Sequence, residues 1–501
     1  MLSAQQAYQQ GMEAERTGDV LRAEQCYREA LAHDEEFTVA RFRLANLLCD
    51  QGHRQEALTC YLLARRQRPD VASIHNNLGT LYKEQGDFEN AYRCFQEAVR
   101  RDPHSLEAWN NLGTIHQWHG DFDQAELCFQ EVLKREPRFP GASINLGNVK
   151  LCRGDFEAAL RCFDNALTIS PQSREARFNR SLALIQFEHF EQGWQEYESR
   201  FGHKVEPRNI SIPRWNPHHH KCETLLVYGE QGVGDEIMFG SCLMEATQAC
   251  RTCFWECDPR LVALFSRSFP AINVLPRPCD HLLSRPAILP AIHAQISAGS
   301  LPMFFRRKME DFPRHTGYLI PNAQLLEKWR DRYRQLPAGL KVGIAWQGGR
   351  EPELQQQRSI PLDIWRPVFS LNGLQFINLQ YGDCTKGLQT IRETIGMTIH
   401  DWDDSDPLTD LDDFAAKIFA LDLVISVDNS TVHLAGGLGV PVWTLLAFTA
   451  DFRWLTGRTQ SPWYPSMRLF RQPKPWDWSA VMEQVTQELH RGFHCVSNRV
   501  A

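Results

Sequence analysis

The chain has 501 residues, of which 43% are hydrophobic and 23% are charged, a composition typical of folded globular domains. Its formal net charge of −7 provides no overall basic field for binding nucleic acid. No apolar run approaches the roughly 18 residues that span a bilayer, and the start of the chain lacks the pattern of a signal peptide, so we expect a cytoplasmic protein without an integral membrane segment.

The first 200 residues repeat with a period of 34. Glycine, alanine, an aromatic residue and proline each recur at this spacing: Gly18, Gly52, Gly86, Gly120 and Gly154; Ala23, Ala57, Ala91, Ala125 and Ala159; Tyr27, Tyr61, Phe95, Phe129 and Phe163; Pro69, Pro103, Pro137 and Pro171. Glycine suits a turn, alanine a close helix contact, the aromatic residue a buried face, and proline a helix end. This pattern resembles the tetratricopeptide repeat. It implies a helical solenoid over residues 1–200, with five clear repeats and a degenerate sixth that carries Gly193 and Tyr197.

Five cysteines share the period: Cys26, Cys60, Cys94, Cys128 and Cys162. Equivalent atoms of stacked repeats lie about 8–10 Å apart, which is too far for disulfides, so we expect free thiols that pack as small apolar groups. Another cluster, Cys250, Cys253 and Cys257, lies in a run that favours a strand, where ligands for a metal would point to opposite faces. Metal binding by this cluster stays an open alternative.

Four asparagines also lie 34 residues apart: Asn77, Asn111, Asn145 and Asn179. In tetratricopeptide proteins this position faces the concave groove, where carboxamides can bond an extended peptide backbone because each is both donor and acceptor. The alternative is a solvated asparagine at a consensus position. We therefore predict a protein or peptide partner in the groove, over the part of the array that carries these asparagines.

Residues 201–222 are rich in proline, histidine and asparagine and predict a linker, in which His218, His219 and His220 favour a solvated loop over a metal site. Beyond it, apolar runs predict strands at 224–228, 253–257, 341–346, 374–380, 422–427 and 441–446. Their uniformly apolar character indicates parallel sheets covered on both faces. A helical segment at 322–336 divides them into two Rossmann-like lobes, 223–320 and 321–501, and ligands of such sheets bind at the carboxyl ends of the strands.

Three loops follow such strands. The first, 229–236, contains Gly232 and Gly234, which either form a tight turn or let the backbone approach an anion. The second, 346–359, offers a glycine turn and the guanidinium groups of Arg350 and Arg358. The third, 428–433, carries hydroxyls and an amide that either cap the next helix or hold a pyrophosphate.

The segments GEQGVGDEIMF, VGIAWQGG with RSIPL, and ISVDNSTVHLAGGLGVPVW resemble glycosyltransferase family 9, the heptosyltransferases, over about residues 222–490. The chain is most similar to bacterial proteins that carry tetratricopeptide repeats ahead of such a domain. The resemblance implies a GT-B pair of lobes, with acceptor groups on the first lobe and a nucleotide sugar held mainly by the second. Asp235 matches the base that deprotonates the acceptor hydroxyl, in an acceptor-side loop with Gly232 and Gly234. The residues that it assigns to donor binding are Gly348, Arg358, Gln380, Asp428, Asn429, Ser430, Thr431 and His433.

The implied function is transfer of a hexosyl or heptosyl group from a nucleotide sugar to an acceptor, such as a protein or peptide presented by the repeats. Two alternatives stay open: an interaction scaffold with a non-catalytic glycosyltransferase-like domain, and a protein modifier like the O-linked N-acetylglucosamine transferases. We expect no cofactor and no metal, with the nucleotide sugar as co-substrate. The acidic stretch 401–413 favours a loop that caps a helix over a site for a divalent metal.

Overall fold

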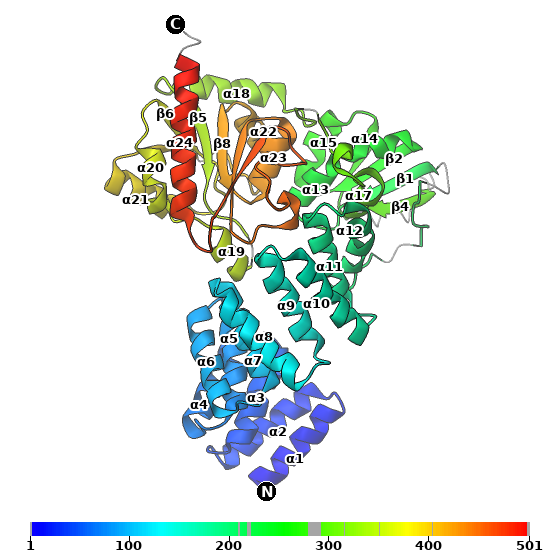
Figure 1. Cartoon of the computed structure of the whole chain (residues 1–501), viewed down its shortest axis with the longest axis vertical. Helices are drawn as coiled ribbons and strands as arrows, with labels where there is room; N and C mark the ends of the chain where they lie inside the picture. The colour runs from blue at the N-terminus through cyan, green and yellow to red at the C-terminus, as the bar shows by residue number, and fades with distance from the viewer. Residues whose placement is uncertain are drawn as a thin grey trace. The chain divides into compact units, whose positions relative to one another are not determined.

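The computed structural model describes residues 3–208, 211–217, 222–278, 292–314, 316–349, 351–402 and 404–497 (Figure 1). The chain divides into two compact units, residues 1–171 and 172–501, so the degenerate sixth repeat groups with the α/β part of the chain. Within the described ranges, no helix is both long and apolar enough to cross a bilayer. The three histidines at 218–220 and Arg350 lie outside these ranges.

The first unit consists of helix pairs, which confirms the predicted repeats (Figure 1). The pairs are α1 (Ala4–Arg16) with α2 (Val20–His33), α3 (Thr38–Asp50) with α4 (Arg54–Gln67), α5 (Ala72–Glu84) with α6 (Phe88–Arg101), α7 (Leu106–His119) with α8 (Phe122–Arg135), and α9 (Pro140–Cys152) with α10 (Phe156–Ile169). The recurring alanines and aromatic residues are buried between the helices, and the recurring cysteines are free thiols.

A left-handed glycine joins the two helices of a repeat. Gly18 and Gly86 both have a φ of 78°, a conformation that is strained for residues with a Cβ. The next residue begins the second helix: the Asp19 carboxylate accepts a hydrogen bond from the backbone amide of Arg22 and caps α2. The same glycine–aspartate pair precedes α6, α8 and α10, so four of the five repeats encode their own turn and helix start. Before α4, Gly52 is followed by His53, whose side chain makes no cap.

Another recurring glycine sets the spacing between the helices of a repeat. A Cβ on Gly113 of α7 would lie 2.7 Å from Cε1 of Phe129 on α8, closer than carbon atoms pack. Gly79 of α5 meets Phe95 of α6 at the same distance. An aromatic ring therefore rests directly on the backbone of the partner helix, which brings the two helix axes close together.

The second unit contains two parallel sheets, as the sequence predicts (Figure 1). The first sheet has the order β3-β2-β1-β4 and the second β10-β9-β8-β5-β6-β7. The strands are β1 (Cys222–Tyr228), β2 (Cys250–Cys257), β3 (Ile272–Pro276), β4 (Ala294–Ser297), β5 (Leu340–Ala345), β6 (Leu374–Asn378), β7 (Ile399–His400), β8 (Leu423–Val427), β9 (Val442–Leu446) and β10 (Met467–Arg471). The predicted strands match β1, β2, β5, β6, β8 and β9, whereas β3, β4, β7 and β10, all at the edges of a sheet, were not predicted.

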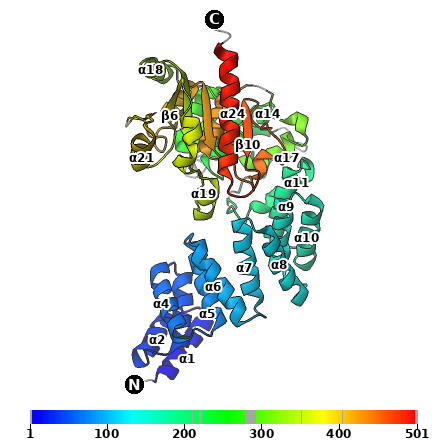
Figure 2. The same cartoon turned by 60° about the vertical axis from the view of Figure 1, so that its left-hand side comes forward.

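Helices cover both sheets. They are α13 (Val233–Gly240), α14 (Leu243–Gln248), α15 (Val262–Ser268), α17 (Pro302–Phe305), α18 (Ala323–Arg334), α19 (Pro352–Arg358), α20 (Arg366–Phe369), α21 (Thr385–Ile395), α22 (Leu411–Phe419), α23 (Ser430–Leu438) and α24 (Trp478–Ser497). The predicted helix at 322–336 is α18. Helix α24 packs against α20 and also lies along β10 (Figure 2).

The sixth repeat forms α11 (Arg174–Gln186) and α12 (Phe190–Tyr197), followed by the short helix η1 (Glu198–Arg200), and it packs on the α/β core. Trp194 of α12 is 1% exposed, and its indole nitrogen donates to the backbone carbonyl of Arg306 at 2.9 Å. The guanidinium of Arg200 is fully buried and lies 3.0 Å from the carboxylate of Glu230 in the predicted first loop. Because a buried charge is unfavourable without a partner, this pair fixes the repeat to that loop.

The predicted linker extends the first sheet instead of only connecting the two parts. The backbone amide of Trp215 donates to the carbonyl of Gln295 in β4 at 2.8 Å, and the Trp215 side chain is 2% exposed. Cys253 and Cys257 of β2 are buried in the apolar core. Among the described residues, no three histidine, cysteine, aspartate or glutamate side chains are placed to hold a metal ion.

Carboxylates of the acidic stretch 401–413 are used as caps and ion-pair partners. Asp410 caps α22 by accepting from two backbone amides, which confirms the capping prediction at this residue. Asp413 accepts from Lys328 at 3.0 Å and from the Trp329 indole at 2.9 Å. These contacts tie the stretch to α18.

The packing of Gly113 against Phe129 predicts that Gly113→Ala destabilises the first unit by about 1–3 kcal/mol, although alanine is the better helix former. Chemical unfolding of the full chain followed by circular dichroism measures the change. In a Phe129→Leu background the clash with the ring is absent, so the same substitution should cost less there. Equal losses in both backgrounds would contradict the proposed cause.

Candidate functional site

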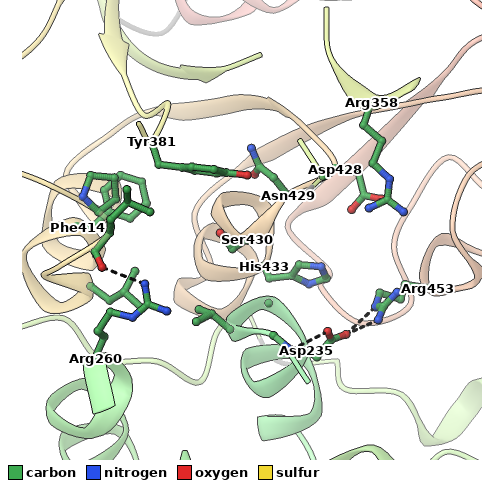
Figure 3. Close-up of a pocket in the computed structure, with 17 residues that line it drawn as sticks. Asp235, Arg260, Arg358, Tyr381, Phe414, Asp428, Asn429, Ser430, His433 and Arg453 are labelled. Carbon is green, nitrogen blue, oxygen red and sulfur yellow. Dashed lines mark hydrogen bonds and ion pairs between the residues drawn. The ribbon is translucent and has the colours of Figure 1, made fainter. Parts of the chain in front are cut away.

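A cleft of about 400 Å³ lies where loops at the carboxyl ends of the two sheets face each other (Figure 3). The first loop contributes Gly232, Gly234 and Asp235, and the third contributes Asp428, Asn429, Ser430 and His433. The two loops are about 200 residues apart in the sequence, and the fold brings them into one cavity.

Of the other predicted residues, Arg358 at the end of α19 also lines the cleft, whereas Gly348, Gln380 and Thr431 do not. A Cβ on Gly348 would lie 2.6 Å from the carbonyl oxygen of Asp428, so this glycine lets two loops touch. The side-chain oxygen of Gln380 accepts from two backbone amides of the second loop at 3.0 and 2.8 Å. Thr431 is 1% exposed. Gly348 and Thr431 therefore support the loops of the cleft, and Gln380 lines a pocket beside it.

The first turn of α13 touches α23 at a glycine. A Cβ on Gly234 would lie 2.9 Å from Cδ2 of His433, so a larger residue would force the two helices apart. Asp235 follows at the third position of α13, where a carboxylate is favoured by the positive end of the helix dipole. The close approach therefore places this carboxylate beside the third loop.

Asn429 both caps α23 and ties the third loop to the second. Its side-chain oxygen accepts from the backbone amide of Thr431 at 3.0 Å, which confirms the capping interpretation at this residue. Its side-chain nitrogen donates to the carbonyl of Gln347 at 3.1 Å. With both ends of the carboxamide engaged, Asn429 holds the start of α23 in a fixed position at the cleft.

His433 is buried between aromatic residues. Nδ1 lies 3.0 Å from the hydroxyl of Tyr464, and the ring stacks on Trp454 with centroids 5.2 Å apart. Burial lowers the pKa of His433 to about 4, because desolvation disfavours the imidazolium more than nearby carboxylates favour it. At neutral pH this side chain is a neutral imidazole, which offers the cleft one hydrogen-bonding nitrogen and no charge.

A row of alternating charges crosses the cleft. Arg453 Nε donates to Asp235 Oδ1 at 3.0 Å, and Arg453 Nη1 contacts Asp451 at 2.6 Å. Arg358 lies 3.5 Å from Asp451 and 3.2 Å from Asp428. The side chains of all five are less than a quarter exposed, so the groups interact in a medium of low effective dielectric constant.

The row favours the charged states of its two central members, Arg453 and Asp451. Burial opposes the charge of Arg453, but Asp235 and Asp451 outweigh burial and keep the pKa of Arg453 well above its ordinary value. Burial would likewise raise the pKa of Asp451, yet Arg453 and Arg358 hold it below the ordinary range. Arg453 and Asp451 are thus both charged at neutral pH, and the cleft is preorganised for an ionic ligand.

Tyr381 and Phe414 lie at the end of the cleft away from Arg453 (Figure 3), and Leu408 also lines the cleft. Arg260 donates to the backbone carbonyl of Leu408 at 3.0 Å and so connects the two sheets at this end. A side pocket of about 260 Å³ continues from here, lined by Gln380 among others. The cavity therefore has one end with two aromatic side chains and Arg260, and another end with the row of alternating charges.

Sequence reasoning missed several residues of the cleft, above all Asp451 and Arg453. The signal available was an aspartate and an arginine two positions apart, shortly after the apolar run of β9. Nothing in that spacing reveals that Asp235, 218 residues earlier, is the partner of Arg453. Tyr381 was missed although its neighbour Gln380 was predicted.

Of the four asparagines that recur every 34 residues, three lie in the first unit and Asn179 lies in the second. In the first unit, Asn111 donates to the side chain of Asn76 at 2.9 Å, and Asn145 donates to Asn110 at 3.0 Å. Asn77 makes the same kind of bond to an asparagine of α3. In the second unit, Asn179 donates to a backbone carbonyl of its own helix, α11.

Comparisons with known proteins agree with the repeat geometry. A family model described as tetratricopeptide repeat matches residues 8–72 and 42–91, and the model of the cilia and flagella-associated protein 70 middle TPR-like domain matches residues 75–199. The N-terminal part of the chain is a tetratricopeptide-repeat array.

Protein FlbA of Caulobacter vibrioides is 31% identical over 327 residues, which make up 62% of this chain and 54% of FlbA. The chain thus spans about half the length of this curated relative. Among solved structures, YrrB, described as a TPR protein with an unusual peptide-binding site, is 23% identical over 35% of this chain and 90% of its own, with a TM-score of 0.31. A tetratricopeptide repeat protein from Parabacteroides merdae is 19% identical over 40% and 79%, with a TM-score of 0.36.

Burial of His433 predicts that His433→Gln makes the stability of the chain less dependent on pH between about 6.5 and 4. In this window the unfolded chain binds a proton that the folded chain excludes, so the wild type loses stability as the pH falls, by about 1.4 kcal/mol per pH unit. Above the window both states are neutral and the two proteins respond alike.

Thermal unfolding at a series of pH values measures this difference. Tyr464→Phe is the control, since it removes the hydrogen bond to His433 but keeps the buried imidazole. An equally steep loss in wild type and His433→Gln would rule out His433 as the source.

Proposed function

We propose that residues 222–490 form a GT-B-type glycosyltransferase that moves a sugar from a nucleotide sugar to an acceptor hydroxyl. The observation that carries the proposal is the position of Asp235. This carboxylate comes from a loop of the first sheet, yet it faces the start of α23 on the second sheet within one cleft. A proton acceptor and an anion-binding helix start on opposite walls suit a reaction that joins an acceptor to an activated sugar.

The chemistry follows from the two ends of the cleft. The aromatic wall at Tyr381 and Phe414 suits a flat nucleoside, and the charged end suits a diphosphate. Backbone amides at the start of α23 and the guanidinium of Arg358 would stabilise the charge that develops on the leaving diphosphate. Neutral His433 would contribute a hydrogen bond to the reacting groups. The proposal assigns this charge stabilisation to protein groups rather than to a metal ion.

The repeat array would bind a protein or peptide, which makes a protein acceptor part of the proposal. Among the described residues, the side-chain oxygens of Asn111 and Asn145 accept no hydrogen bond, although their nitrogens donate to neighbouring repeats. These oxygens can therefore accept from the backbone amides of an extended peptide.

A second candidate function is an interaction scaffold without catalysis. The observation that favours it is the ion pair between Asp235 and Arg453, because Asp235 Oδ1 accepts from the guanidinium instead of from an acceptor hydroxyl. Nucleotide binding distinguishes the two candidates.

Calorimetric titration of the purified chain with nucleoside diphosphates and nucleotide sugars is the first test. We expect one nucleotide to bind, and we expect His433→Ala to weaken that binding about tenfold or more, through loss of a hydrogen bond and of packing at the start of α23. His400→Ala, on β7 and outside the cleft, is the matched control and should bind normally. A folded protein that binds none of the panel would favour the scaffold.

Asp235→Asn tests the assignment of the base. The amide is nearly isosteric with the carboxylate but does not accept a proton, so transfer should fall about 10²–10⁴-fold while nucleotide binding is retained. Release of nucleoside diphosphate from the bound nucleotide sugar, with water as the acceptor, measures the rate. An unchanged rate would exclude Asp235 as the base and leave the nucleotide site intact.

A further inference from the structure

We propose that Arg453 is a further catalytic residue, which exchanges Asp235 for the leaving diphosphate and thereby makes the base available only when the nucleotide sugar is bound. This inference rests on the proposed function. It goes beyond it by coupling the two walls of the cleft through one guanidinium.

The geometry gives Arg453 two partners on two edges. Its Nε and Nη2 atoms both face Asp235 Oδ1, and its Nη1 atom contacts Asp451. Two donors therefore occupy Oδ1 of Asp235, whereas Oδ2 accepts only the backbone amide of Gly232 at 3.4 Å. For Asp235 to accept a proton at Oδ1, the Nε and Nη2 edge of Arg453 has to bind something else.

The donor geometry of Arg453, and not the net charge of the row, points to what that is. Asp235, Asp451 and Asp428 carry three negative charges, and Arg453 and Arg358 carry two positive ones. A diphosphate adds further negative charge and has to compete with these carboxylates for the guanidinium groups. A planar guanidinium edge fits phosphate oxygens as well as it fits a carboxylate, since both present paired acceptors.

Of the three carboxylates, Asp235 is the one that a ligand displaces most easily from a guanidinium. Asp451 is held by both arginines and also caps the short helix η6 (Phe452–Trp454) through the backbone amide of Arg453 at 3.1 Å. Asp428 is 7% exposed and pairs with Arg358. Asp235 has one further described contact, from the backbone amide of Gly232 at a long 3.4 Å.

The backbone of Arg453 is fixed while its side chain faces the cleft. Phe452 packs against Tyr197 of α12 with ring centroids 5.5 Å apart, and the guanidinium of Arg453 lies 4.6 Å from the centre of the Phe452 ring. The sixth repeat thus anchors the segment that carries Arg453. A rotation of the side chain alone moves the guanidinium between partners.

The reaction then balances as follows. The acceptor hydroxyl gives its proton to Asp235, and its oxygen forms a bond to the anomeric carbon of the sugar. The bond from that carbon to the diphosphate breaks, and its electron pair stays on the diphosphate oxygen, which Arg453 and Arg358 neutralise.

Competition for Arg453 makes a specific prediction for nucleotide binding. Asp235→Asn should tighten the binding of nucleoside diphosphate, by about fivefold or more, because the ligand no longer displaces a carboxylate from the guanidinium. In an Arg453→Gln background the same substitution should have little effect. Titration calorimetry on the four proteins of this double-mutant cycle, with the nucleotide found above and with inorganic pyrophosphate, measures the coupling.

If Asp235→Asn acts only by removing a negative charge from the cleft, it will tighten nucleotide binding equally in both backgrounds. That result would overturn the inference about Arg453 but would leave the proposed nucleotide site supported. Failure of every nucleoside diphosphate to bind would reject the proposed function and this inference with it. Arg458→Gln, in the same segment but paired with Glu188 outside the cleft, is the matched control for Arg453→Gln. Arg453→Lys keeps the positive charge but lacks the planar guanidinium, so this variant should fold even if Arg453→Gln does not. The effect of Asp235→Asn on nucleotide binding should be smaller in the Arg453→Lys background than in the wild type.

Discussion

The contact between Gly234 and His433 sets how closely α13 and α23 approach each other at the cleft. A bare Cα on α13 lies against an imidazole ring on α23, and helices from two different sheets approach to a distance that no larger residue allows. This contact places Asp235 beside the third loop. It also contributes to the burial that keeps His433 neutral, so the charge state of the histidine and the position of the carboxylate have one common cause.

Charges in the cleft depend on one another in the same way. The three inner members of the row, Arg453, Asp451 and Arg358, each contact two neighbours of opposite charge. The ion pairs of the row are therefore coupled to one another. A ligand that binds one guanidinium of the row therefore also changes the ion pairs of the carboxylates that this guanidinium contacted. In the proposed glycosyl transfer this links recognition of the nucleotide to the freedom of the base, without movement of a whole domain.

Much of the fold follows from local sequence. Each repeat of the first unit has a glycine at its turn, and four of the five have a capping aspartate after it. Central strands such as β8 are unbroken apolar runs because both faces are covered. The strands that sequence missed are edge strands: β10, for example, has Arg468 and Arg471 among its five residues, since an edge tolerates polar side chains. The first and third loops of the site were predicted because their glycines, amides and hydroxyls lie directly after strands. Arg453 was not, because its importance comes from a partner supplied by the other sheet.

The buried row of charges also bears on the balance between stability and activity. Removing five ionised groups from water is expensive, and well-packed apolar side chains of similar size would hold the same two sheets together at least as firmly. Selection for folding stability alone would not retain such a row of charges. The cleft is therefore less stable than an apolar interface of the same size would be. We expect substitutions that raise the thermal stability of this protein to concentrate in the cleft and to lower its activity.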